Sequence, residues 1–361
     1  MKLVANLKLV PDAAQSKALR DTLITANAAC NAISKTAFET HTFGQFALHK
    51  PTYHETKRRF GLNAQMVVRC IAKVADAYKA GRQTLRRFRP DSAQPYDDRI
   101  LRFCANDTVS IWVLGGRIKV PFRCGDHQRR LLEHRKGEVD LMRVNGVFYL
   151  ACVCDVDDPA LIETTDVLGV DLGVVNIAAD SRGRTYSGKK TERIRKTFEH
   201  RRRNLQRKQT RSATRKLVKI SGRQARFQKD TNHCISKAIV SEAQRSLSAI
   251  ALEDLTGIRG RVQAPRPRRA RLHNWPFAQL RAFLGYKAAL KGLPVILVDP
   301  AYTSQTCPAC GHFERGNRPT RSEFRCRSCG LAGPADTIAA RNIRARALVN
   351  APTVASVQWV A

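Results

Sequence analysis

Seven residues of this chain have the types and spacing of metal-binding side chains, and they fall into two groups. The members of the first group are Cys307, Cys310, Cys326 and Cys329. They form two CxxC pairs with fifteen residues between the pairs, and Gly311 and Gly330 follow them as tight turns require. The spacing predicts a four-cysteine zinc ribbon with a structural role, because four sulfurs complete a tetrahedron and leave no open position.

The second group consists of three acids, Asp171, Glu253 and Asp336. Asp171 and Glu253 each end an apolar, strand-like run, and Asp336 falls in the first turn of an expected helix. Each acid taken alone is compatible with an ordinary turn or cap residue. Together, three carboxylates from separated segments can hold two divalent cations about 4 Å apart, the arrangement of two-metal phosphodiester cleavage. Mg²⁺ suits such oxygen ligands. Asp254 would point to the opposite face of its strand, so Glu253 is the expected ligand.

The elements expected in the C-terminal half bring these acids together. They are strands at 167–171, 176–179, 184–187, 249–253 and 294–298, a long helical segment interrupted near Ser221 and Gly222, and helices at 275–291 and 335–349. Three strands, helix, strand, helix, strand, helix is the order of the RNase H-like fold. The zinc ribbon would be inserted between the last strand and the helix that carries Asp336.

The N-terminal half predicts a different architecture. A strand that ends before Pro11 is followed by helices at 12–39 and from Asn63 to about Phe88. Short alternating strands follow at 109–114, 117–120, 139–144 and 147–153, with a hairpin turn at Asn145-Gly146. This order indicates a small β-barrel or wedge with a helical lobe inserted after its first strand. The acidic segment 155–166 is the expected linker to the next domain.

Composition indicates the class of partner. The 361 residues include 64 Lys and Arg against 30 Asp and Glu, which gives a net charge of +34. A folded chain so positive needs a polyanion, and nucleic acid is favoured over an anionic membrane because no basic amphipathic surface helix is recognisable. No apolar run approaches membrane-spanning length and no signal-peptide pattern is visible, so we expect a soluble, unsecreted protein. The other seven of the eleven cysteines are expected to be small hydrophobes in a reducing cytoplasm.

Basic residues concentrate in three places. Residues 193–229 contain fifteen Lys or Arg and one acid, the loop 259–271 contains six Arg, and the helix after Asn63 has a basic side. Such runs can be solvated faces, but an excess of one sign over several turns favours contact with phosphates. The predicted nucleic-acid contacts are Arg69, Lys73, Arg86, Arg87, Arg201, Arg202, Arg203, Arg207, Lys208, Arg211, Arg215, Lys216, Arg268 and Arg269.

Four motifs in this order resemble the TnpB family of insertion-sequence proteins, which is related to the type V CRISPR effector nucleases. The motifs are GVDLG, LEDL, the stretch from NWPFAQLRAFLGYKAALKG to VDPAYTSQTCPACG, and CRSCG followed by ADTIAARNI. The resemblance implies an α/β multidomain protein, with a wedge-type barrel (1–10 and 96–160) and a helical recognition lobe (11–95). It further implies a RuvC-like, RNase H-like nuclease domain (161–300 and 331–361) and a zinc-ribbon target-nucleic-acid-binding insertion (301–330).

The resemblance also implies a function. An RNA-guided DNA endonuclease of a bacterial transposable element would bind a guide RNA derived from the element end. It would cut double-stranded DNA next to a short target-adjacent motif, in the cytoplasm or on the nucleoid, without any role for a membrane. Base pairing would read the target in that scheme.

One position departs from the family pattern. The family commonly has Asn two residues after the third acid, and this chain has Ile338. Such an Asn is expected to orient the acids, so its absence bears on cleavage. Two other functions stay open beside the nuclease. One is an RNA-guided DNA-binding repressor without nuclease activity, which loss of a catalytic acid would signal, and all three acids are present. The other is a transposase that catalyses strand transfer, which RNase H-like folds also support.

Overall fold

The computed structural model describes residues 1–173, 175–255 and 277–350, and the chain divides into two compact units, Met1–Asp157 and Asp158–Ala361. Each unit has its own sheet and its own hydrophobic core. We describe the units one at a time.

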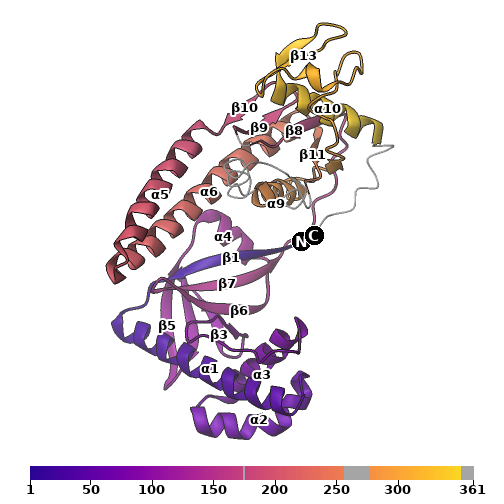
Figure 1. Cartoon of the computed structure of the whole chain (residues 1–361). Helices are drawn as coiled ribbons and strands as arrows, with labels where there is room; N and C mark the ends of the chain where they lie inside the picture. The colour runs from indigo at the N-terminus through magenta and orange to yellow at the C-terminus, as the bar shows by residue number, and fades with distance from the viewer. Residues whose placement is uncertain (174, 256–276, 351–361) are drawn as a thin grey trace. The chain divides into compact units, whose positions relative to one another are not determined.

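The first unit is built on a seven-stranded antiparallel sheet in the order β2-β6-β7-β1-β5-β4-β3, which is nearly closed (Figure 1). Its strands are β1 (Lys2–Leu9), β2 (Gln94–Tyr96), β3 (Leu101–Cys104), β4 (Thr108–Val113), β5 (Gly116–Arg123), β6 (Arg135–Val144) and β7 (Val147–Asp155). The hairpin between β6 and β7 turns at Asn145 and Gly146 with φ of 51° and 84°. Positive φ at both residues is the geometry that an Asn-Gly hairpin turn needs.

The helices of this unit are α1 (Ala13–Glu39), α2 (Gln45–Phe60), α3 (Ala64–Lys79) and α4 (Asp126–Leu132). The predicted starts of α1 and α3 are confirmed: Asp12 accepts the Gln15 amide, and Asn63 accepts the Met66 amide. The prediction that α3 continues to Phe88 is wrong. After Lys79 the chain runs along α1, where the side-chain amide of Asn31 bonds both the carbonyl and the N–H of Phe88 and replaces helical bonds.

The second unit contains a five-stranded mixed sheet in the order β10-β9-β8-β11-β12. Its strands are β8 (Asp166–Asp171), β9 (Asn176–Asp180), β10 (Thr185–Ser187), β11 (Ser248–Glu253) and β12 (Val295–Val298). Strands β8, β11 and β12 are parallel, and β9 and β10 are antiparallel to their neighbours. The strands and helices follow one another in the predicted order.

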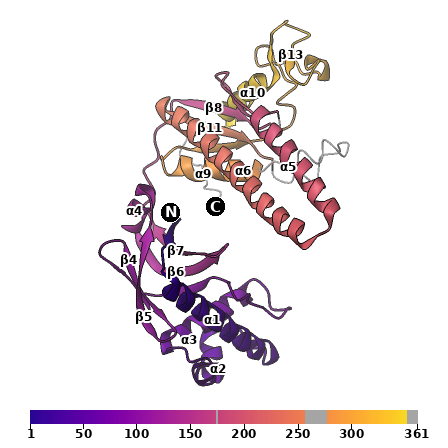
Figure 2. The ribbon, with the colours of Figure 1, turned by 90° about the vertical axis from the view of Figure 1, so that its left-hand side faces the viewer.

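The helices of the second unit are α5 (Lys189–Lys208), α6 (Arg211–Arg245), α9 (Phe277–Ala289) and α10 (Ala335–Asn350). Helices α6 and α9 pack on the sheet face of Leu168 and Val170, and α10 packs on the opposite face (Figure 2). Gly169 allows this second contact, because a Cβ there would lie 2.1 Å from the carbonyl oxygen of Ala340. The predicted start of α9 at Trp275 lies outside the described residues.

The long helical segment breaks at a different place from the one predicted. Ser221 and Gly222 lie inside α6, and the chain reverses at Gln209, whose φ is 49°. Thr210 then caps α6 by accepting the Ala213 amide at 3.2 Å. The side-chain cap decides the break, because a single glycine inside a helix costs only about 1 kcal/mol.

The cysteine-rich segment lies between β12 and α10, as predicted from the sequence. It contains the short strands β13 (Glu323–Arg325) and β14 (Ala332–Pro334) and one 3-10 turn, η1 (Arg315–Asn317). A small core joins it to α10, in which Cys307, Phe324 and Cys326 pack against Ala335 and Ile338.

Candidate active site and nucleic-acid interface

Asp171 and Glu253 end two adjacent parallel strands. Val170 of β8 is paired with Leu252 of β11, so the two acids follow at the same edge of the sheet. Alternation along the strands sends both to the face that α10 covers, where Val167, Ala249 and Ala251 also pack. Asp254 points the other way and bonds Arg281 of α9 at 2.8 Å, as its place in the strand predicted.

Asp336 reaches the same region from the first turn of α10. A carboxylate is favourable there because the N-terminus of a helix carries partial positive charge. Both of its oxygens have partners: the Asn176 amide donates to Oδ2 at 2.9 Å, and Arg318 of the cysteine-rich segment lies 3.6 Å from Oδ1. The third acid is thus held by residues from two other parts of the unit.

Burial and neighbouring charges shift the pKa values of two of the acids. Burial raises the pKa of Asp171 to about 7, with further increases from the negative charges of Glu253 and Asp336 and a smaller opposing effect of Arg318. Burial also raises the pKa of Glu253. The increase caused by Glu253 and Asp336 adds to the larger effect of burial. Perturbed carboxylates from separate segments are typical of functional sites.

Two residues that the sequence analysis did not predict hold the side chain of Glu253 in place, one directly and one indirectly. The Thr303 hydroxyl donates to Glu253 Oε1 at 2.5 Å, and the buried Asn342 amide donates to the carbonyls of Thr303 and Thr306, each at 2.7 Å. Asn176, Arg318 and Thr303 each contact one of the three acids from a different segment of the chain, and Asn342 holds Thr303 in the same way. No local spacing signal could have found these contacts.

Ile338 occupies the position where the family commonly has Asn. Its side chain is 1% exposed and belongs to the core that packs the cysteine-rich segment on α10. The amide that bonds Asp336 comes instead from Asn176 of β9.

The two predicted metal groups differ in how closely their atoms lie. The four cysteine sulfurs lie within 4.8 Å of one another, the only such group of metal-binding side chains in residues 1–173, 175–255 and 277–350. Amide donation from Cys329 lowers the pKa of Cys326 to about 6, whereas contacts with Cys310 and Cys307 raise the pKa of Cys329. The cluster could hold a metal such as zinc. The three carboxylates supply oxygen donors of the kind that Mg²⁺ prefers, but they are not grouped so tightly.

The predicted basic contacts in the first unit are mostly engaged within the protein. Arg69 is paired with Glu138 and lies near Asp97, and Arg86 donates to the Gly81 carbonyl. The Lys73 ammonium donates to Asn27 at 2.6 Å and also contacts Gln94, and burial lowers its pKa. Arg87 is exposed. Nucleic-acid binding by these four residues stays a prediction.

The dense basic run forms the helix pair α5 and α6. Arg202 bonds Gln224, Arg203 pairs with Glu199, and Arg207 bonds Asn204, so these three have protein partners. Arg211 and Arg215 are exposed at the start of α6. Arg268 and Arg269, with the rest of the loop 259–271, lie outside the described residues.

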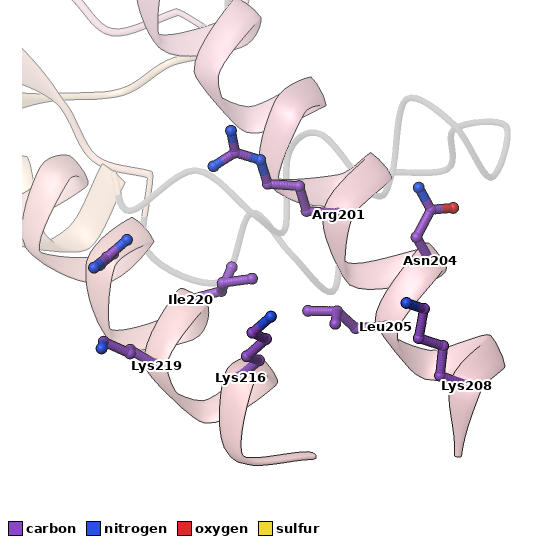
Figure 3. Close-up of a pocket in the computed structure, with 8 residues that line it drawn as sticks. Arg201, Asn204, Leu205, Lys208, Lys216, Lys219 and Ile220 are labelled. Atoms are coloured by element: carbon purple, nitrogen blue, oxygen red, sulfur yellow. The ribbon is translucent and has the colours of Figure 1, made fainter. Parts of the chain in front are cut away.

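The remaining predicted contacts on these helices are Arg201, Lys208 and Lys216, and they line a groove between α5 and α6 (Figure 3). Lys219 and Arg223 of α6 line it too. The groove is therefore bounded by basic side chains from both helices.

Similarity to solved structures first defines the fold. The chain aligns with a protein chain in the cryo-EM structure of a Cas12f1–sgRNA–target DNA complex, with a TM-score of 0.66 and 15% identity. The alignment covers 93% of this chain and 83% of that one. At this identity the match shows a shared mixed α/β fold.

Sequence relatives then indicate the family. The description "Probable transposase" matches residues 151–258, and "Cas12f1-like, TNB domain" matches residues 277–343. A TnpB-like protein of Methanocaldococcus jannaschii is 35% identical over 43% of this chain and 56% of its own length. A CRISPR-associated endodeoxyribonuclease Cas12f1 of Sulfoacidibacillus thermotolerans is 32% identical over 51% of this chain and 46% of its own.

The protein named "Putative RNA-guided DNA endonuclease InsQ" of Escherichia coli is 30% identical over 50% of this chain and 49% of its own length. These matches confirm the resemblance to the TnpB family, which is related to the type V CRISPR effectors. The chain spans about half the length of these relatives. Among the described helices, none has the length and apolar character needed to cross a membrane.

Proposed function

We propose that this protein is an RNA-guided DNA endonuclease of a bacterial transposable element that cuts DNA next to a short target-adjacent motif. The observation that carries the proposal is the placement of three acids from separate elements: Asp171 and Glu253 end adjacent parallel strands at one sheet edge, and Asp336 in the first turn of α10 is bonded to Asn176 of the same sheet. The names of the relatives, which include RNA-guided DNA endonucleases and Cas12f1, support it.

The domain division that goes with this function has four parts. Residues 161–300 and 331–361 form a RuvC-like nuclease domain, and 301–330 form a zinc ribbon that binds target nucleic acid. Residues 1–10 and 96–160 form the wedge, and 11–95 form the recognition lobe. The strand order of the five-stranded sheet and the nearly closed seven-stranded sheet are consistent with this division.

Asp171, Glu253 and Asp336 would hold Mg²⁺ ions, which supply the charge for a water to attack the phosphodiester and for the leaving oxygen to depart. The protein contributes the arrangement of the acids. Asn176 holds one oxygen of Asp336, and Thr303, itself fixed by Asn342, orients Glu253. Closer approach of the three carboxylates is opposed by their repulsion, and bound cations would remove that cost.

Arg318 adds a positive charge beside Asp336. In the complex with DNA this guanidinium would be available to a phosphate oxygen near the acids. The four cysteines would hold a structural Zn²⁺, which would stabilise the segment that carries Arg318.

A guide RNA and double-stranded target DNA are the proposed partners. The net charge of +34 suits a protein that neutralises two polynucleotides. The solved relative in complex with sgRNA and target DNA supports the same pair of partners.

The test is to purify the protein with co-expressed element-end RNA and to incubate it with plasmids that carry a matched target and randomised flanks. We expect Mg²⁺-dependent linear product. Alanine at Asp171, Glu253 or Asp336 should each lower single-turnover cleavage at least about 10³-fold while DNA binding persists. Asp254→Ala is the matched control, because this acid faces α9 and should leave cleavage largely intact.

Other outcomes identify the competing functions. Tight, guided binding without cutting by the wild-type protein would indicate a repressor, and joined element ends would indicate a strand-transferring transposase. Cleavage that survives all three substitutions would exclude the acid site proposed here.

A further inference from the structure

The groove between α5 and α6 has a composition that the proposed nuclease activity does not explain. The two helices run antiparallel on either side of Gln209, and the space between them measures about 450 Å³. Its cations are Arg201, Lys208, Lys216, Lys219 and Arg223, and none of the residues that line it is acidic.

Several other cations on the same helices have partners within the protein. Arg195 is paired with Glu192 and Glu199, and Arg203 with Glu199. Among the interactions of the described residues, the five groove cations have neither an ion pair nor a side-chain hydrogen bond. Glu192 and Glu199 therefore pair with cations that do not line the groove, and the groove keeps its positive charge. Like charges held this close repel one another, so an anionic ligand is the natural complement.

The floor of the groove is apolar. Leu205 of α5 and Ile220 of α6 point toward one another between the helices, with the basic groups arranged around them (Figure 3). Both side chains are only partly buried, so they keep apolar surface exposed inside a basic rim. A ligand that fills the groove must bring a flat or apolar part as well as negative charge.

We propose that this groove binds an unpaired nucleotide of a single-stranded polynucleotide, with the base on Leu205 and Ile220 and the flanking phosphates on the basic rim. A positive groove with an apolar platform is how proteins hold single strands. A duplex would satisfy the rim alone, because its bases are stacked inside and it is too wide to enter. The inference rests on the proposed function for the presence of nucleic acid, and it does not depend on cleavage.

The test measures binding by the full-length protein, freed of nucleic acid at high salt, to labelled 12-nucleotide single-stranded DNA, single-stranded RNA and duplex DNA. EDTA is present, so cutting plays no part. The groove variant is Lys208→Gln with Lys216→Gln. The matched control is Lys196→Gln with Lys229→Gln, which removes one exposed lysine from each of the same helices outside the groove.

We expect the groove variant to lower the slope of log affinity against log salt by about 1.4 for single strands, because two phosphate contacts are lost. The control should change the slope less. A fourth arm uses single-stranded DNA with abasic sites, which should bind the wild-type protein more weakly than the intact strand. The DNA and RNA arms identify which single strand the groove prefers.

Equal effects of the groove and control variants would overturn the assignment of the groove. Equal binding of intact and abasic strands would overturn the contact with the base, as would a variant that weakens duplex binding alone. Failure of wild-type cleavage with normal single-strand binding would count against the proposed nuclease and not against the groove.

Discussion

Asp171 holds its proton more tightly than a free aspartate does, because burial and the neighbouring acids raise its pKa to about 7. A carboxylate in this setting destabilises the folded protein whenever it is ionised without a cation nearby. The same unfavourable charge makes the site receptive to divalent ions. At the residue scale, ionised Asp171 should therefore lower the free energy of unfolding of the metal-free protein, and stability measurements can detect this.

Asp171→Asn should stabilise the metal-free protein at pH 8. The pKa is raised in the folded state, so the contribution of the protonated carboxyl is present below about pH 4 and is lost as the pH rises to about 7. The gain from Asn should be small at pH 4.5 and grow to at most about 4 kcal/mol at pH 8. Urea unfolding in EDTA at both pH values measures it, with Glu163→Gln, an exposed acid, as the control. A gain that does not grow with pH would contradict the electrostatic account.

Thr303→Val should weaken the response to Mg²⁺ because Glu253 loses its hydroxyl donor. Losing such a supporting contact typically costs about 10- to 100-fold in metal affinity or activity. The Mg²⁺ concentration at half-maximal cleavage rate is the measurement. Thr306→Val, in the same loop, is the control, because that hydroxyl bonds only the Tyr302 carbonyl. Equal responses of the two variants would remove Thr303 from the site.

Asn176→Ala tests the amide contact with Asp336 in the same way. We expect single-turnover cleavage to fall about 10- to 100-fold while affinity for target DNA is retained. An unchanged rate would mean that Asp336 needs no amide partner and that Ile338 is tolerated for another reason.

The arrangement of elements explains why some of these residues were predictable and others were not. Asp171 and Glu253 end apolar strands, so pattern and strand order indicated their common edge. Asn176 meets Asp336 across 160 positions, and Asn342 meets Thr303 across 39, and no local signal encodes such pairs. The predicted end of α3 was wrong for a related reason, because the contacts of Asn31 in α1 with Phe88 hold the segment after Lys79 out of a helix. Helix α2 was not predicted, and it contains Pro51, a residue that disfavours helix interiors.

Gly169→Ala should displace α10 and with it Asp336. The added Cβ would lie 2.1 Å from a backbone carbonyl, so a shift of the helix is required and the free energy of unfolding should fall by about 3 kcal/mol or more. Gly285→Ala is the opposite case, because its Cβ meets nothing within 4 Å in helix α9, and stability should rise by about 1 kcal/mol. Chemical denaturation of both variants provides the comparison. Equal stability of the two variants would contradict the close contact between β8 and α10.

At the scale of the whole molecule, we expect the net positive charge to contribute more to nucleic-acid affinity than any individual contact does. A net charge of +34 over 361 residues means that many phosphates can be neutralised at once. Binding of this kind holds polynucleotides without reading their sequence. In the proposed function, the charged protein would hold the nucleic acids and a base-pairing guide would select the target.

Affinity for nucleic acid should accordingly fall steeply with salt. For six to ten phosphate contacts, the association constant should drop about 10³- to 10⁵-fold between about 50 mM and 200 mM KCl. Fluorescence anisotropy with a non-target duplex measures this slope. A nearly flat dependence would mean that the basic surface is not the binding surface.

The small core around Ile338 has a consequence for metal supply. The same isoleucine packs in one core with two of the cysteines and stands two residues after Asp336, so the first turn of α10 carries one of the three acids and contacts the cysteine cluster. If the cluster holds zinc and the acids hold magnesium, as proposed, loss of zinc would loosen the cysteine-rich segment and also displace Asp336. In that case zinc depletion would also lower the proposed magnesium-dependent cleavage.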